Sequence, residues 1–231
     1  MRRSKLYKSQ IGSFEASARY SVKDALNALK AMPAVKFDQT VEAAFRLGID
    51  PRKSDQNVRG AVALPSGTGK SVRVAVVCDG PQADAAKAAG ADFVGYEDLV
   101  EQIKNGWQDF DILIATPNAM KLVRPLGRQL GPRGLMPNPK TGTVTENVEP
   151  AVKEAKAGRV EFRADKGGCV HVPFGKMSFT AEALEANLRV IIDALLKARP
   201  SSTKGAYMLG CTISATMTPG VKLNAKELSG E

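Results

Sequence analysis

Few residues in this chain have the types and spacing that enzyme or metal chemistry needs. His171 is the single histidine, and the three cysteines, Cys78, Cys169 and Cys211, are far apart with no Cys-x-x-Cys pair. An odd number of separated cysteines argues against a disulfide framework and against a structural zinc site. We therefore predict no catalytic residue, no metal ligand and no cofactor. His171 is expected to be structural, or at most to contact nucleic acid.

Two glycine-containing segments could bind a phosphate. Gly67-Thr68-Gly69-Lys70-Ser71 ends like a P-loop, but the glycine required five residues before Gly69 is replaced by Leu64. A P-loop also joins a strand to a helix, whereas an apolar strand follows here. Asp79-Gly80-Pro81 follows an apolar strand without a Gly-x-Gly-x-x-Gly pattern. We interpret the first segment as a hinge and the second as a turn, and keep a nucleotide-binding or nucleotide-hydrolysing α/β protein as the alternative function.

The distribution of charge favours a polyanionic partner. The formal net charge is +9, from 33 Lys and Arg against 24 Asp and Glu. Residues 70–156 contain 11 basic and 11 acidic residues, so the whole excess lies in the two ends of the chain. Such a bias is typical of proteins that bind nucleic acid. A DNA-binding regulator would share this charge, but the sequence contains no recognisable recognition-helix motif.

Two short segments of the basic ends carry side chains that suit RNA. Residues 36–40 and 216–219 lie at the ends of predicted strands and combine hydroxyl groups with a flat or soft apolar side chain. Hydroxyls can contact ribose and phosphate, and apolar groups can stack on bases. In the middle of the chain, residues 112–145 contain no acidic residue, and either a solvated basic loop or a phosphate contact fits that charge. The basic residues of this stretch are Lys121, Arg124, Arg128, Arg133 and Lys140.

The elements that would position these residues differ between the middle and the ends. The middle alternates strands and helices, which predicts a small parallel sheet covered by helices. The predicted strands are 72–78, 93–96 and 111–116, the predicted helices are 82–89, 97–105 and 118–130, and 126–145 is predicted to be an ordered loop.

The two ends of the chain predict an α+β unit. Ser21 and Thr180 are expected to cap two amphipathic helices that end before Pro33 and Pro200. The remaining pattern predicts strands at 36–47, 60–64 and 206–216, and a hairpin formed by 159–164 and 169–172.

Neither end alone has enough elements for a stable core, so we predict that they fold together. The predicted fold class is α+β and α/β in two domains. A discontinuous α+β domain would comprise residues 1–66 and 158–231, and a Rossmann-like α/β domain would be inserted as residues 67–157. The two crossings, near residues 64–69 and 157–158, would form a glycine-containing hinge.

Four blocks of the sequence resemble one known family in the same order along the chain. They are Leu47-Gly48-Ile49-Asp50-Pro51-Arg52-Lys53-Ser54-Asp55-Gln56-Asn57-Val58-Arg59-Gly60, the stretch from Leu126 to Thr145, Phe162-Arg163-Ala164-Asp165-Lys166, and Thr216-Met217. On these blocks the chain is identified as a member of the L-one family of large-subunit ribosomal proteins, the mobile-stalk proteins, in its bacterial form. The resemblance extends from about residue 20 to residue 223.

The resemblance implies a non-enzymatic, RNA-binding function. Members of this family bind a hairpin region of the large ribosomal RNA, mainly through the discontinuous domain. The positions that match their RNA-binding residues are Lys36, Phe37, Thr40, Thr216 and Met217, and further positions that match the family pattern are Arg52, Lys53, Arg163 and Lys166.

The same resemblance implies further partners and a location. The stalk helps to release deacylated tRNA from the exit site, and bacterial members typically repress translation of their own operon mRNA. These roles imply a cytoplasmic protein in the large ribosomal subunit, monomeric when free and without a membrane partner. Thr218 is a departure, because the family commonly has glycine after the Thr-Met pair, and we expect it to shift or weaken the RNA contact.

Overall fold

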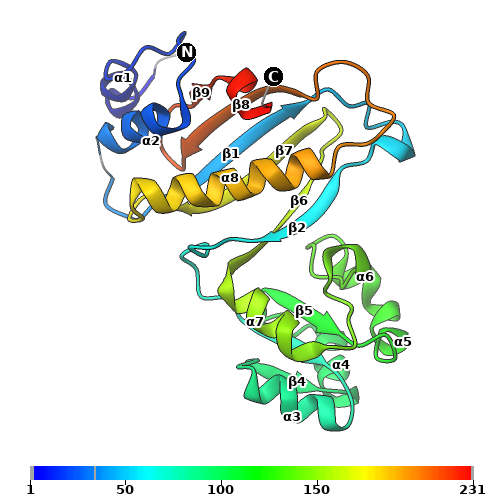
Figure 1. The fold of residues 1–231 in the computed structure, drawn as a ribbon. Coiled ribbons are helices and arrows are strands. Elements are labelled where there is room, and N and C mark those ends of the chain that lie inside the picture. Colours follow the sequence, from blue (N-terminus) through cyan, green and yellow to red (C-terminus); the bar gives the residue numbers. More distant parts are fainter. Residues whose placement is uncertain (1–2, 34, 230–231) are drawn as a thin grey trace. The chain divides into compact units, whose positions relative to one another are not determined.

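The computed structural model describes residues 3–33 and 35–229, and the chain forms two compact units (Figure 1). Unit 1 comprises Met1–Gly69 and Val160–Glu231, and unit 2 comprises Lys70–Arg159. The units therefore divide at residues 69/70 and 159/160, where the sequence analysis places the boundaries at 66/67 and 157/158. Unit 1 is α+β and unit 2 is α/β, as predicted.

Unit 1 is built on a four-stranded antiparallel sheet in the order β7-β1-β8-β9. The central strand β1 places Thr40 opposite Lys176 at one end and Arg46 opposite Cys169 at the other. These two ends of the sheet position the two groups of residues described below. The strands are β1 (Thr40–Leu47), β7 (Cys169–Lys176), β8 (Met208–Ala215) and β9 (Val221–Leu223).

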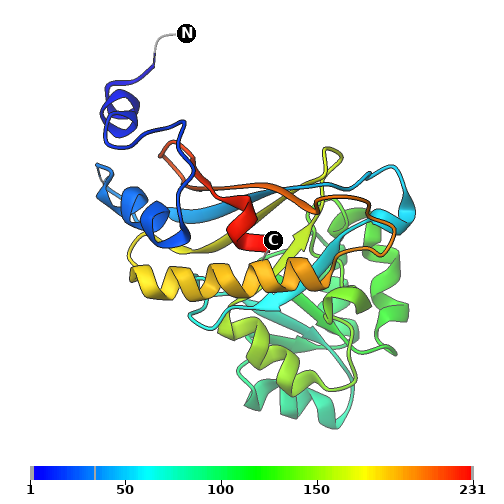
Figure 2. The ribbon, with the colours of Figure 1, turned by 45° about the horizontal axis from the view of Figure 1, so that its top comes forward.

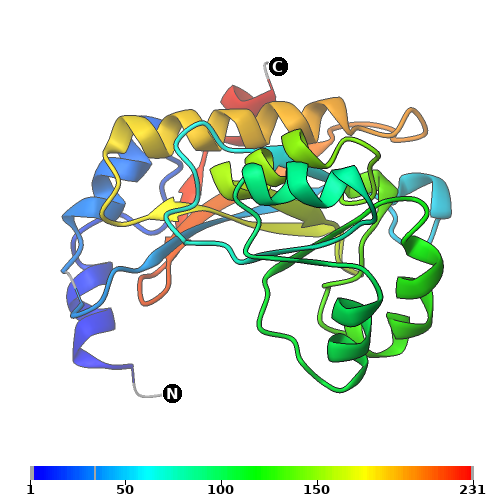
Figure 3. The same cartoon turned by 90° about the horizontal axis from the view of Figure 1, so that it is seen from below.

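Helices cover one face of this sheet, as the rotated views show (Figures 2 and 3). They are α2 (Val22–Ala31), α8 (Ala181–Lys197) and the short α9 (Ala225–Ser229), while α1 (Lys5–Ile11) precedes them. The Ser21 hydroxyl accepts the Asp24 N–H at 3.3 Å, and the Thr180 hydroxyl accepts the Ala183 N–H at 3.2 Å. Both predicted caps are therefore confirmed.

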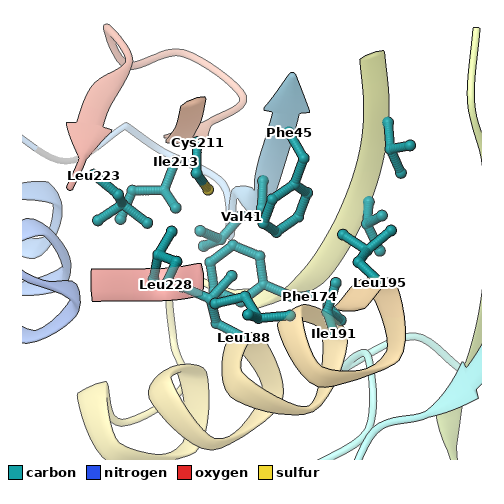
Figure 4. Close-up of a cluster of buried hydrophobic side chains, with 14 of the residues drawn as sticks. Val41, Phe45, Phe174, Leu188, Ile191, Leu195, Cys211, Ile213, Leu223 and Leu228 are labelled. Carbon is teal, nitrogen blue, oxygen red and sulfur yellow. The ribbon is translucent and has the colours of Figure 1, made fainter. Parts of the chain in front are cut away.

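The core of unit 1 lies between the sheet and α8 (Figure 4). Alternate residues of β1, including Val41 and Phe45, are fully buried on the helix-facing side. They pack with Phe174 of β7 and with the apolar stripe of α8 formed by Leu188, Ile191 and Leu195. Burying the large apolar groups of both layers is the main stabilising contribution to this unit.

The predicted hairpin of residues 159–164 and 169–172 is wrong. Strand β6 (Arg159–Arg163) pairs with β2 (Arg59–Ala63) in a separate two-stranded sheet, and β7 pairs with β1 instead. Only a single bridge, Ala164 to Val170, joins the two predicted partners. The eight-residue β7 matches the length and burial pattern of β1, so it pairs there and buries more apolar surface than a five-residue hairpin could.

Unit 2 is a three-stranded parallel sheet in the order β4-β3-β5 with helices on both faces. All four residues of β3 are buried, and successive ones join opposite clusters, so Val74 and Val76 pack with α7 while Ala75 and Val77 pack with α4. This is the predicted Rossmann-like layering. The main elements are β3 (Val74–Val77), α3 (Pro81–Ala88), β4 (Phe93–Gly95), α4 (Glu97–Lys104), β5 (Ile112–Ala115) and α7 (Val148–Gly158).

The helix predicted for residues 118–130 is present but broken into short turns. Residues 120–130 form α5 (Met120–Val123), a 3₁₀ turn η2 (Arg124–Leu126) that contains Pro125, and α6 (Gly127–Leu130). The predicted loop 126–145 thus begins with a helical turn, because Leu126 and Leu130 are buried and anchor it. Two more 3₁₀ turns occur, η1 (Ser54–Gln56) in unit 1 and η3 (Pro139–Thr141) in unit 2.

Within the described residues, no helix has the length and apolarity to cross a membrane, and no group of three or more His, Cys, Asp or Glu side chains is placed to hold a metal ion.

Candidate nucleic-acid interface

Five of the predicted RNA-binding residues come together at one end of the unit 1 sheet. Lys36, Phe37 and Thr40 lie where the chain enters β1, and Thr216 and Met217 lie in the turn from β8 to β9. We call these five residues the Phe37–Met217 surface. The Thr40 N–H donates to the Thr216 hydroxyl at 3.2 Å, and the Thr216 N–H donates to the Thr40 carbonyl at 3.2 Å. Segments 176 residues apart in the chain are thereby fixed against each other.

Gln39 is a buried link beneath this surface that the sequence analysis does not identify. Its side chain is only 3% exposed, and its Oε1 accepts the Met217 N–H at 2.8 Å. Its backbone carbonyl accepts the Met177 N–H at 2.9 Å. Because the amide is removed from water, both bonds hold their partners in place more strongly than surface contacts would. The position of Met217 therefore depends on Gln39.

Two large apolar side chains of this surface face solvent. Phe37 and Met217 are each 52% exposed, and in the described part of the chain the only other exposed large hydrophobic residue is Leu209. Aromatic and thioether groups held at a rigid strand end, beside a lysine and two threonine hydroxyls, are suited to stacking on unpaired bases. The arrangement fits single-stranded or looped RNA better than a duplex groove.

Lys176 adds a second cation at this end of the sheet. It is the last residue of β7, and its Nζ lies 3.0 Å from the Thr40 hydroxyl and 3.4 Å from the Asp38 carbonyl. The adjoining Asp38 carboxylate accepts the Ser178 hydroxyl at 2.8 Å and the Ser178 N–H at 3.1 Å. A cavity of about 410 Å³ opens beside Phe37, between these residues and α2. Only the pairing of β1 with β7 brings Lys176 here, and the sequence pattern does not give that pairing.

The other four predicted residues, Arg52, Lys53, Arg163 and Lys166, do not join this surface. All four are exposed and lie around the opposite end of β1, Arg163 as the last residue of β6 and the other three in loops, where the Leu47 N–H donates to the Gly168 carbonyl at 2.9 Å. An eight-residue strand is about 25 Å long, so β1 separates the two groups by roughly that distance. The nine predicted residues thus form two distinct basic regions of one unit.

Comparison with known proteins decides the family. A sequence model described as the Ribosomal protein L1p/L10e family matches residues 29–219. The chain belongs to this family. The large ribosomal subunit protein uL1 of Saccharophagus degradans is 55% identical over 228 residues, which cover 99% of this chain and 97% of that protein. The protein of the same name from Mannheimia succiniciproducens is 54% identical over 227 residues, with 98% of each chain covered. The family is one of ribosomal proteins and not of enzymes.

The departure at Thr218 has a structural role in this member of the L1p/L10e family. Its hydroxyl accepts the Ala215 N–H at 2.8 Å, and its own N–H donates to the Ala215 carbonyl at 3.1 Å. Among the described residues, positive φ angles occur only at glycines, so the turn does not require glycine at this position. Thr218 closes the turn that presents Thr216 and Met217.

The P-loop-like segment of this family member is held by protein groups. Gly67 and Gly69 have φ angles of 69° and 72°, and no helix follows them before strand β3. The buried Asn187 of α8 accepts the Ser66 N–H and donates to the Gly67 carbonyl, each at 3.0 Å. The geometry therefore disfavours the nucleotide-binding alternative.

Proposed function

We propose that this chain binds large-subunit ribosomal RNA at the mobile stalk through the discontinuous α+β domain, residues 1–66 and 158–231. The observation that carries the proposal is the Phe37–Met217 surface, where two exposed apolar groups, two threonine hydroxyls and a lysine are fixed at one strand end. Phosphate and ribose contacts would set the position of the RNA, and stacking would select unpaired bases. The site of action is then the cytoplasm, with a free protein that is monomeric and has no membrane partner.

The test is a binding titration with an RNA fragment that contains the stalk hairpin, in the presence of competing duplex DNA at about 50 and 200 mM salt. We expect nanomolar-range binding that resists the DNA. The double variant Thr216→Ala with Met217→Ala should raise the Kd at least about tenfold, or roughly 1.4 kcal/mol. Asn27→Ala is the control, since that side chain is exposed on helix α2. An unchanged Kd in the double variant would refute the surface assignment.

A second proposed role is the repression of translation from the chain's own operon mRNA. The support is that one surface can bind either RNA: an mRNA with a loop similar to that of the ribosomal RNA would bind the same five residues. The operon leader and the rRNA fragment should then compete, and the double variant should weaken both. Simultaneous binding of both RNAs would refute this role.

A third proposed role is to assist the release of deacylated tRNA from the ribosomal exit site. The support is the acid-free segment 112–145 of unit 2, whose Lys121, Arg124, Arg128 and Arg133 are all exposed. Lysine and arginine release counterions from a polyanion when they bind it. Arg124→Gln with Arg128→Gln should slow exit-site tRNA release from reconstituted ribosomes without changing the Kd for the rRNA fragment. An unchanged release rate would contradict the role.

A further inference from the structure

Three loops of unit 1 meet at the end of β1 that lies opposite the Phe37–Met217 surface. The Leu47 N–H donates to the Gly168 carbonyl at 2.9 Å, which ties β1 to the loop between β6 and β7. The Gly48 N–H donates to the Tyr207 carbonyl at 2.7 Å, which ties it to the loop between α8 and β8. A side chain at Gly48 would lie 2.3 Å from the Ala206 carbonyl oxygen, so this close approach requires glycine.

A third bond joins two of these loops farther out. Gln56, which is 7% exposed, accepts the Asp50 N–H at 2.7 Å through Oε1 and donates to the Ser202 carbonyl at 3.4 Å through Nε2. The turn that carries Arg52 and Lys53 is thereby held against the loop of residues 198–207. In Figures 1 and 2 these two loops lie side by side at the same end of the sheet.

The three loops, together with Arg163 at the end of β6, expose six cations. We call them together the basic-loop surface, which consists of Arg52, Lys53, Arg163, Lys166, Arg199 and Lys204. Among the described residues, no ion pair within 4.0 Å involves any of these six side chains. The Arg199 guanidinium already donates to the Gly205 carbonyl at 3.1 Å, and the other five side chains are available to an external anion.

The carboxylates of the same loops are engaged with backbone groups. Asp50 accepts the Arg52 N–H at 3.2 Å, and Asp165 accepts the N–H groups of Gly167 and Cys169 at 2.8 and 2.7 Å. These bonds shape the loops, and neither carboxylate forms an ion pair with the cations. With Asp55 included, six cations face three carboxylates, so the surface retains a net positive charge.

We propose that the basic-loop surface is a second RNA-binding surface, which holds the phosphate backbone of the same ribosomal RNA that the Phe37–Met217 surface recognises. The loop of residues 198–207, with Lys204 and Arg199, is its unassigned third part. This inference rests on the proposed function. The six side chains of the basic-loop surface include no apolar group that could stack on a base, so they contact the RNA backbone and not the bases. The two surfaces lie about 25 Å apart, at opposite ends of the same sheet. RNA that binds at the first surface is therefore present at a raised local concentration at the second.

The test compares Lys204→Gln with Lys23→Gln, an equally charge-neutralising change at an exposed lysine of the helix layer. With the stalk rRNA fragment, Lys204→Gln should raise the Kd about threefold to tenfold and lower the slope of log K against log salt by about one, whereas Lys23→Gln should change neither. Lys204→Glu should enlarge both effects. Far-UV circular dichroism should show that all three variants are folded.

The outcomes separate this inference from the function on which it rests. If Lys204→Gln behaves as Lys23→Gln does while Thr216→Ala with Met217→Ala still weakens binding, the second surface is refuted and the first stands. If Lys204→Gln weakens binding only of free deacylated tRNA, the ribosomal RNA is the wrong partner for this surface. If the unchanged protein does not bind the fragment, the proposed function itself fails.

Discussion

At the scale of single residues, the proposed interface depends on a side chain that need not touch RNA. Gln39 is buried and holds the Met217 N–H, so it sets the place of the exposed thioether. A glutamine between an aspartate and a threonine gives no sign of this in the sequence. The same holds for Lys176, which reaches Thr40 only through strand pairing. The sequence therefore predicted the exposed groups of the Phe37–Met217 surface and not the groups that position them.

Gln39→Leu should show this dependence. Removing the acceptor leaves the Met217 N–H unpaired, which should lower the free energy of unfolding by about 1–3 kcal/mol. The Met217 amide should lose hydrogen-exchange protection, and the Kd for the rRNA fragment should rise. Retained protection at Met217 would show that another group holds the turn. Gln10→Leu, at a second buried glutamine whose Nε2 donates to the Pro33 carbonyl and not to this turn, is the control.

A second residue-scale prediction concerns Asp92 of unit 2. Its Oδ2 accepts hydrogen bonds from the Lys156 ammonium and from the Val74 N–H, each at 2.7 Å. The hydrogen bond from Lys156, with a further one from Val74, lowers the pKa of Asp92 below its ordinary value of 3.8. The charged form is therefore stabilised by folding, and this stabilisation is present above about pH 4 and lost as the pH falls through the lowered pKa.

Asp92→Asn should thus destabilise unit 2 at neutral pH by no more than about 1 kcal/mol, because the ion pair is partly exposed. The difference in unfolding free energy between the variant and the unchanged protein should become smaller below pH 4. Urea unfolding monitored at pH 7 and pH 3 measures both values. A difference that is constant over this range would contradict the assignment.

At the scale of elements, local signals predicted helices better than strand partners. The caps predicted at Ser21 and Thr180 are confirmed. A cap and the apolar stripe after it lie within a few residues, so the local sequence is enough to predict them. The partner of β6 was predicted wrongly, because alternation defines a strand's faces and not its neighbour. Helix α7 went unpredicted, since its buried face consists largely of small residues such as Ala151 and Ala155.

The contact between β2 and β6 gives an element-scale prediction. A side chain at Gly60 would lie 2.7 Å from Cζ of Phe162, which is 4% exposed. Gly60→Val should therefore cost about 1–3 kcal/mol of unfolding free energy. Phe162→Leu should recover part of this cost in the double variant. Gly210→Ala, where nothing lies within 4 Å, should change the urea midpoint little. Equal effects at Gly60 and Gly210 would refute the contact.

At the scale of the whole molecule, unit 1 has its own hydrophobic core, and two clusters lie on the two faces of the unit 2 sheet. The chain's single tryptophan, Trp107, packs with Phe93 and Phe110 in unit 2. Its fluorescence therefore reports on that unit alone.

Leu130→Ala should lower the stability of unit 2 by about 2–5 kcal/mol and shift the fluorescence transition to lower urea, with a smaller shift in far-UV circular dichroism. The matched change in unit 1, Leu188→Ala, should move mainly the circular dichroism transition. Both leucines are fully buried. Coincident transitions in both variants would mean that the units unfold as one.

The pairing of β2 with β6 has a consequence for how the insertion is tolerated. The Ala164 N–H donates to the Val58 carbonyl at 2.9 Å, so the start of β2 pairs with the end of β6. Unit 2 therefore connects these two paired strands in the way that a hairpin loop would. When unit 2 is folded, its own core keeps the ends of that loop together. When it melts, the loop becomes a flexible chain of about 90 residues, whose closure entropy exceeds that of a short turn by about 2–3 kcal/mol. Folding of unit 2 thus stabilises the pairing of β2 with β6 in unit 1 by lowering the entropy cost of closing the connection.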